Sequence, residues 1–169
     1  MRPGRREKKR RGAARSAAAE GLGRSRGGLT TKVIVVATDE DTAVAVDVVP
    51  GQTHDAPLLE PMLDATRKRV SVIDELVGDK AFDGDPQREA CVDRNIFPNV
   101  PNKKNRVDPW PFMAEGYRER NKVERLFAKA KQYRRFATRY EKLRVMFLGV
   151  VHLVFGFIRL KRLNNVNTA

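Results

Sequence analysis

The sequence lacks several features that define whole classes of protein. Its 169 residues include a single cysteine, Cys91, which excludes a disulfide framework and any metal cluster built from cysteines. It has no secretory signal, because its basic first twenty residues contain no apolar segment. The longest apolar stretch, residues 145–160, falls short of the roughly 20 apolar residues that a membrane-spanning helix needs. We therefore expect a cytoplasmic protein with no membrane partner.

Acidic residues are also scarce relative to basic ones. The chain has 34 Lys and Arg against 21 Asp and Glu, a formal net charge of +13. Such an excess is typical of proteins that bind a polyanion such as nucleic acid. Hydrophobic residues make up 41% of the chain, so it can still bury a core.

Composition divides the chain into three parts. Residues 1–28 are predicted to be a disordered basic arm, which either keeps the protein in solution or binds phosphates. Residues 29–163 are predicted to fold as one domain, and residues 164–169 form a tail. Hydrophobic periodicity within the domain predicts strands at 31–38, 43–49, 71–77 and 96–100, and helices at 56–69, 86–95, 117–138 and 141–163. This order indicates an α/β fold, a mixed sheet flanked by helices.

The predicted helix 117–138 combines a carboxylate with many cations. At about 100° per residue, four polar side chains fall within about 60° of one another. They are Tyr117, Arg120, Glu124 and Lys131. A separate basic stripe, facing solvent or phosphates, consists of Arg118, Lys122, Arg125 and Lys129. The pattern alone favours an ordinary surface ion pair between Arg120 and Glu124, worth only a few tenths of a kcal/mol.

A second carboxylate, Asp79, directly follows the predicted strand 71–77. Side chains at strand ends project into the crevices where ligands bind in α/β sheets, although Asp is also a common turn cap. Asp79 and Glu124 could converge on a divalent metal, because Mg²⁺ prefers oxygen ligands and is held by one or two carboxylates.

Other residues are weaker candidates. His54 is more readily explained as a turn residue than as a ligand. Trp110 could stack on a DNA base, but it is better explained as an anchor for the loop 101–111. The final helix is apolar almost all round, which predicts that it is buried, with His152 packed in the core.

Several motifs together resemble one family. The residues Tyr117, Arg120, Glu124 and Lys131 fit the pattern Y-x₂-R-x₃-E-x₆-K, which resembles the YREK signature of bacterial insertion-sequence DDE transposases. Further segments resemble motifs of the same group in the same order: GRSRGGLTTK (23–32), PGQTHD (50–55), GDKAFD (78–83) and RRFATRYEKL (134–143). The resemblance extends from about Gly21 to Phe157.

The resemblance implies a ribonuclease-H-like fold and metal-dependent DNA cleavage and strand transfer. Asp79 and Glu124 would be the second and third acidic residues of a catalytic triad that holds two Mg²⁺ (or Mn²⁺) ions. Tyr117 and Lys131 would contact DNA near the cut, and Arg120 would steady the helix face or a phosphate. The partners would be double-stranded DNA at transposon ends and target, in a nucleoid-associated bacterial protein. A homodimer and a product of an upstream reading frame remain open as further partners.

One departure from the family pattern limits this expectation. The first catalytic Asp of the family lies on a strand upstream of the GRSRGG segment, whereas here the only acids before Asp39 are Glu7 and Glu20. We therefore expect the N-terminal part and the first strand of the sheet to be missing and the chain alone to be inactive. It would be a decayed copy or the downstream frame of a frameshifted transposase. The alternative function is that of a catalytically inactive DNA-binding remnant.

Overall fold

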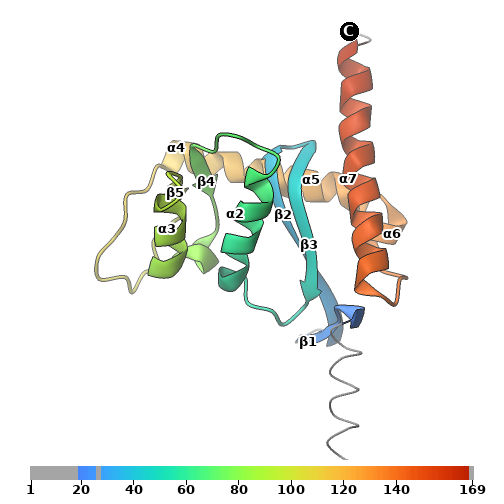
Figure 1. Ribbon diagram of the computed structural model, residues 1–169, viewed down its shortest axis with the longest axis horizontal. Helices are drawn as coiled ribbons and strands as arrows, with labels where there is room; N and C mark the ends of the chain where they lie inside the picture. The colour runs from blue at the N-terminus through green and yellow to red at the C-terminus, as the bar shows by residue number, and fades with distance from the viewer. Residues whose placement is uncertain (1–18, 26–27, 168–169) are drawn as a thin grey trace, which may run out of the picture. The chain divides into compact units, whose positions relative to one another are not determined.

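The structure, a computed structural model, describes residues 19–25 and 28–167 (Figure 1). Strands and helices are both present, which confirms the predicted α/β class. The described residues form two compact units: a first unit of residues 19–25, 28–34, 46–53 and 130–167, and a second unit of residues 35–45 and 54–129. Most of the predicted basic arm, residues 1–18 and 26–27, lies outside the described residues.

One sheet has three strands in the order β1 (Gly23–Ser25), β2 (Gly28–Asp39) and β3 (Thr42–Pro50). The hairpin of β2 and β3 agrees with the prediction from their β-branched residues. Asp39 fixes the turn, because its carboxylate accepts hydrogen bonds from the Asp41 N–H at 2.8 Å and the Thr42 hydroxyl at 3.0 Å. β1 pairs antiparallel with β2, so ordered structure begins before Leu29, inside the segment predicted to be an arm.

The second sheet is a parallel pair, β4 (Glu75–Val77) and β5 (Phe97–Asn99). Both strands are shorter than predicted, and Pro98 gives one reason, because proline has no N–H to donate to a ladder. The sequence predicted one mixed sheet, but the described strands form two separate sheets. The ribonuclease-H-like topology therefore stays a prediction.

Helices cover the parallel pair within the second unit. The predicted helix 56–69 consists of a 3₁₀ turn, η1 (Ala56–Leu58), and α2 (Leu59–Arg67), and the predicted helix 86–95 is α3 (Asp85–Val92). The core between them consists of Leu59, Leu63, Cys91 and Ile96, with Ile73, Leu76 and Phe82 packed against it. Burial raises the pKa of the Cys91 thiol to about 11, which makes it an unreactive core residue.

The predicted helix 117–138 has several parts. They are α4 (Ala114–Tyr117), the 3₁₀ turn η3 (Arg118–Arg120), α5 (Asn121–Lys131) and, after a break, α6 (Arg134–Ala137). The apolar side is correctly predicted at Leu126 and Ala130, which are fully buried. Because a 3₁₀ turn advances about 120° per residue, Tyr117 is rotated by about 60° relative to its place in a uniform helix.

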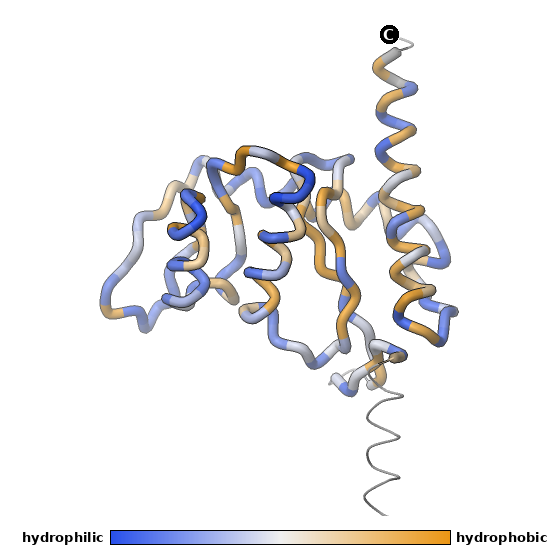
Figure 2. Tube along the Cα trace, viewed as in Figure 1, coloured by the Kyte–Doolittle hydropathy of each residue, from blue (hydrophilic) through white to orange (hydrophobic). Residues whose placement is uncertain are grey.

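The last helix, α7 (Arg144–Asn167), belongs to the first unit. Figure 2 shows apolar residues recurring along its whole length. The prediction that this helix is buried all round is wrong: one face is buried and the other is exposed, including His152. The buried face consists of Phe147, Val151, Val154, Phe155 and Ile158. No helix of the described residues is long and apolar enough to cross a membrane.

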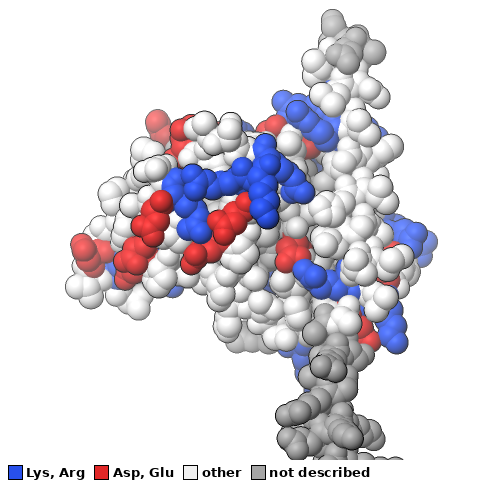
Figure 3. Space-filling view, in the orientation of Figure 1, with Lys and Arg blue, Asp and Glu red and all other residues white. Residues whose placement is uncertain are grey.

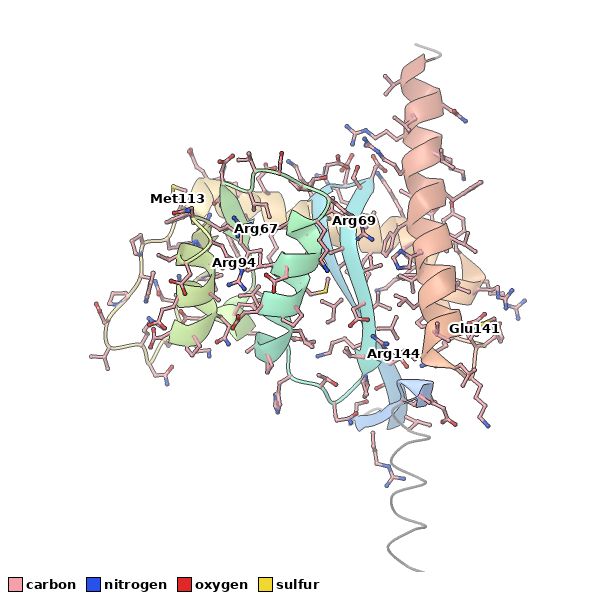
Figure 4. All side chains as sticks on the ribbon, viewed as in Figure 1. Arg67, Arg69, Arg94, Met113, Glu141 and Arg144 are labelled. Carbon is pink, nitrogen blue, oxygen red and sulfur yellow. The ribbon has the colours of Figure 1, made fainter. Side chains whose placement is uncertain are left out.

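The family-like segment 134–143 has a structural role in the first unit. The Arg139 guanidinium donates to the carbonyl of Lys142 at 2.9 Å and also bonds Thr31 and the carbonyl of Glu20. Burial lowers the pKa of Arg139, and the neighbouring carboxylates of Glu141 and Glu20 offset part of that effect. Arg139 therefore ties the start of the described chain to the loop before α7, where Figure 4 labels Glu141 and Arg144.

Candidate active site

Asp79 lies where the chain leaves β4, as the sequence predicts. It is exposed and caps the short 3₁₀ turn η2 (Lys80–Phe82), because its Oδ1 accepts the Ala81 N–H at 2.8 Å. The strand-end position and the capping role therefore both hold. Within the described part of the chain, the second carboxylate oxygen has no hydrogen-bond partner, so one oxygen is available to a ligand.

Glu124 lies in the first turn of α5, and 62% of its side chain is exposed. Its Oε1 lies 2.5 Å from the Arg120 guanidinium, so the surface ion pair considered from the sequence is present. An exposed pair four residues apart on a helix is worth only about 0.3–0.5 kcal/mol. Glu124 can therefore exchange Arg120 for another cation at little cost.

A buried asparagine, Asn99, connects the elements that carry these two acids. It is the last residue of β5 and has no exposed surface. Its amide NH₂ donates to Glu75 Oε1 at 2.6 Å and to the Met113 carbonyl at 2.9 Å, and its Oδ1 accepts the Met113 N–H at 3.0 Å. Met113 immediately precedes α4 (Figure 4). One side chain thus fastens the start of the helical run to the parallel strands.

A closely packed glycine and a backbone hydrogen bond belong to the same junction. The backbone N–H of Gly78, the residue before Asp79, donates to the Asn99 carbonyl at 3.4 Å. A Cβ added at Gly116 would lie 2.8 Å from Glu75 Oε1 and 2.9 Å from Asn99 Nδ2, so any side chain at this position would displace these two hydrogen-bonded groups. Asn99 and Gly116 were not identified from the sequence, because their roles depend on contacts between residues distant in the chain.

Asp79 and Glu124 therefore belong to one unit and to elements joined through Asn99. The described residues contain no group of three His, Cys, Asp or Glu side chains placed to hold a metal ion. The convergence of the two carboxylates on a metal stays a prediction.

Close to Asp79 in sequence, Asp83 forms a buried ion-pair network. Its carboxylate lies 2.8 Å from the Arg88 guanidinium and 3.2 Å from that of Arg106, and it accepts the Lys103 N–H at 2.6 Å. Burial by itself raises the pKa of Asp83, but the Lys103 hydrogen bond and the two guanidinium groups together lower it below its usual value. The network fixes the loop that follows β5.

Trp110 anchors that loop, in agreement with the preferred explanation. Asn102 holds its backbone at both ends, because the Trp110 N–H donates to Asn102 Oδ1 at 3.0 Å and Asn102 Nδ2 donates to the Trp110 carbonyl at 2.9 Å. The Arg88 guanidinium lies 5.6 Å from the centre of the indole ring, within cation–π range.

The predicted DNA-binding stripe is largely occupied by carboxylates of this chain. Arg125 lies 2.9 Å from Glu40 and Lys129 lies 2.6 Å from Asp41, both in the turn between β2 and β3. Lys122 pairs with Glu119. Three further predicted residues have different surroundings: Arg118 and Lys131 are exposed, and the Tyr117 ring packs edge-on against Phe112 at 5.3 Å. His54 is exposed after β3.

A second basic group was missed from the sequence, although the run Arg67-Lys68-Arg69 could have signalled it. All three side chains are exposed at the end of α2. Arg69 donates to the Val44 carbonyl at 2.6 Å and Arg67 to the Arg94 carbonyl at 3.5 Å, contacts that hold the guanidinium groups without cancelling their charge. Figure 3 shows Lys and Arg gathered over this region, and Figure 4 labels Arg67, Arg69 and Arg94 around the end of α2.

Comparison with known proteins adds independent evidence. Residues 4–155 match the family model described as a transposase DDE domain. Over 135 residues the chain is 30% identical to a protein of Brucella ovis named as a transposase for insertion sequence element IS6501. That alignment covers 79% of this chain and all of the Brucella protein. No solved structure matches the chain significantly.

Proposed function

Because the chain belongs to the insertion-sequence DDE transposase family, we propose that it serves DNA transposition through metal-dependent DNA cleavage and strand transfer. The observation that carries the proposal is the placement of Asp79 and Glu124. Both are exposed carboxylates within family-like motifs, on elements that the buried Asn99 joins. The substrate would be double-stranded DNA at transposon ends and target, in the bacterial nucleoid.

The two carboxylates suit Mg²⁺ or Mn²⁺, which prefer oxygen ligands and keep several waters. When bound, the metal ions would activate the attacking oxygen and stabilise the leaving oxygen of the cut strand. Asp79 would bind through the oxygen that does not cap η2, and Glu124 would bind after releasing Arg120. The released guanidinium would then be free to hold a DNA phosphate.

A third acidic ligand belongs to the proposal. The resemblance assigns it to a strand upstream of Gly23, so we propose that a polypeptide segment outside the described residues supplies it. The second candidate function is DNA binding without catalysis. It is favoured by the net charge of +13 and by the Arg120–Glu124 pair, which already neutralises one of the two acids.

Iron-directed cleavage of the polypeptide tests the metal site without requiring catalysis. Fe²⁺ bound in place of Mg²⁺ generates hydroxyl radicals with ascorbate and peroxide, and these cut the nearby backbone. We expect cuts beside both Asp79 and Glu124 that excess Mg²⁺ suppresses and that Asp79→Asn and Glu124→Gln each abolish. Glu115→Gln, at an exposed acid of α4, is the matched control and should leave the pattern unchanged. Cuts that persist in both site variants would refute the assignment.

Nicking of duplex DNA, assayed with the upstream segment that carries the third acid restored to the chain, then separates the two candidate functions. Mg²⁺-dependent nicking that disappears in Asp79→Asn and in Glu124→Gln supports catalysis. Duplex binding that weakens with salt but is never followed by nicking supports the binding remnant.

A further inference from the structure

The exposed face of α7 carries an uninterrupted apolar seam. Its members recur at alternating spacings of three and four residues: Met146, Gly149, Leu153, Gly156, Leu160 and Leu163. Every member is exposed, and Met146, Leu153 and Leu160 retain 60%, 75% and 57% of their accessible surface. This spacing is typical of helices that pair along their length.

The seam lies on the side of α7 opposite to the buried face. A Cβ added at Gly149 or at Gly156 would meet nothing within 4 Å, so the surface over both glycines is open. Three more exposed apolar side chains flank the seam: Val145, Phe157 and Val166. Contiguous exposed apolar surface of this extent marks an interaction site.

We propose that the seam packs against the same seam of a second copy, with the two α7 helices antiparallel. Pairing about the midpoint of the seam places Leu160 of the second copy over Gly149 and Leu153 of the second copy over Gly156. Met146 then faces Leu163 of the second copy. Each leucine fills the space that a glycine leaves open, and the two-fold symmetry repeats every contact.

A parallel arrangement would lack this complementarity. It would set glycine opposite glycine and leucine opposite leucine, which leaves gaps at two levels and crowds the others. Unfilled gaps lose the dispersion contacts that stabilise a close-packed interface. The order of large and small residues along the seam therefore selects the antiparallel pair.

The available area suits a dimer of moderate affinity. Fully burying an exposed apolar side chain of this size removes roughly 100 Å² from water. Four large seam residues and three flanking ones, each between 44% and 75% exposed, therefore bury roughly 400 Å² per copy. With the glycine backbone the total approaches the roughly 1,000 Å² that a specific interface needs. The charge of +13 on each copy opposes association, so screening by salt should strengthen the dimer.

The dimer does not depend on the proposed chemistry. It would nevertheless carry the Asp79–Glu124 pair twice, and so could engage two DNA segments at once. A dimer that forms without a metal-dependent activity supports this inference and leaves the proposed function to its own test.

Sedimentation equilibrium of the full chain over a concentration series tests the interface. We expect a monomer–dimer equilibrium whose dissociation constant falls at higher salt. Leu153→Glu should raise that dissociation constant by about 100-fold, since two charges per dimer enter an apolar seam. Val72→Glu is the matched control, because Val72 is exposed to 69% in the second unit, and it should leave the equilibrium unchanged. A chain that stays monomeric throughout, or a dimer indifferent to Leu153→Glu, would overturn the proposal.

Engineered cysteines report the orientation, because the native Cys91 is buried. Chains with Gly149→Cys mixed with chains with Leu160→Cys should form a disulfide between the two variants. Each variant alone should remain uncrosslinked, since the like positions lie about 16 Å apart along an antiparallel pair. Efficient self-crosslinking of either single variant would indicate parallel helices and contradict the proposed arrangement.

Discussion

Replacing Asn99 by alanine should loosen the junction between the parallel strands and the helix that carries Glu124. The substitution removes three hydrogen bonds and leaves Glu75 and the Met113 N–H without the Asn99 side chain as partner, while the Met113 carbonyl keeps the Tyr117 N–H at 3.0 Å. A buried polar group left unpaired costs roughly 1–3 kcal/mol. Glu75 is half-buried and Met113 is 50% exposed, so water replaces part of the loss. We expect the free energy of unfolding to fall by about 2–3 kcal/mol.

Chemical denaturation measures this change, and Asn105→Ala is the matched control. Asn105 is exposed in the loop after β5, so its truncation should change the free energy of unfolding by less than about 0.5 kcal/mol. The variant Asn99→Asp should be at least as damaging as Asn99→Ala, because it sets a second carboxylate against Glu75. Adding Glu75→Gln reverses the amide and carboxylate roles and should recover about 1–2 kcal/mol.

The same variants report on the site as well as on stability. If Asn99 positions α4 and α5, iron-directed cuts beside Glu124 should shift or weaken in Asn99→Ala under conditions where that variant is still folded. The cuts should return in the Glu75→Gln/Asn99→Asp double variant. An unchanged free energy of unfolding in Asn99→Ala, or no recovery in the double variant, would refute the reasoning.

Three further predictions follow from other contacts. Asp83→Asn should lower the free energy of unfolding by about 3–5 kcal/mol, because it leaves a buried guanidinium uncompensated. Folding lowers the pKa of Asp83, so its contribution to stability is complete above about pH 3.8 and is lost as pH falls through the lower pKa of the folded state. This acid-induced loss of stability should be absent from Asp83→Asn and present in Asp85→Asn. Glutamine at all three positions of residues 67–69 should reduce the slope of log affinity for duplex DNA against log salt by about 3, whereas an unchanged slope would exclude this cluster from DNA binding. Gly116→Ala should lower the free energy of unfolding by about 1–3 kcal/mol in thermal or chemical melts, because the added methyl group meets Glu75; a neutral result would contradict the close packing.

Periodicity predicted those parts of the fold that depend on neighbouring residues. The hairpin of β2 and β3 follows from alternating β-branched residues, and the buried side of α5 follows from the positions of Leu126 and Ala130. It could not predict the junction at Asn99, because an asparagine at a strand end has the same local pattern whether it caps a turn or fastens a distant helix. The prediction from periodicity also failed for α7. Apolar residues on every side of a helix indicate burial only if a partner covers each side.

Periodicity also could not assign the role of Glu124 in the candidate site. The four-residue spacing of Arg120 and Glu124 permits a surface ion pair and a catalytic carboxylate, and the sequence offers no means of choosing between them. The structure shows the ion pair, and the catalytic role of Glu124 stays a proposal. The pair is exposed and worth only a few tenths of a kcal/mol, so a divalent ion that binds Glu124 has little to displace. Under the proposed function, Glu124 would leave Arg120 for the metal ion and the freed guanidinium would hold a DNA phosphate, so a weak pair would cost the site little.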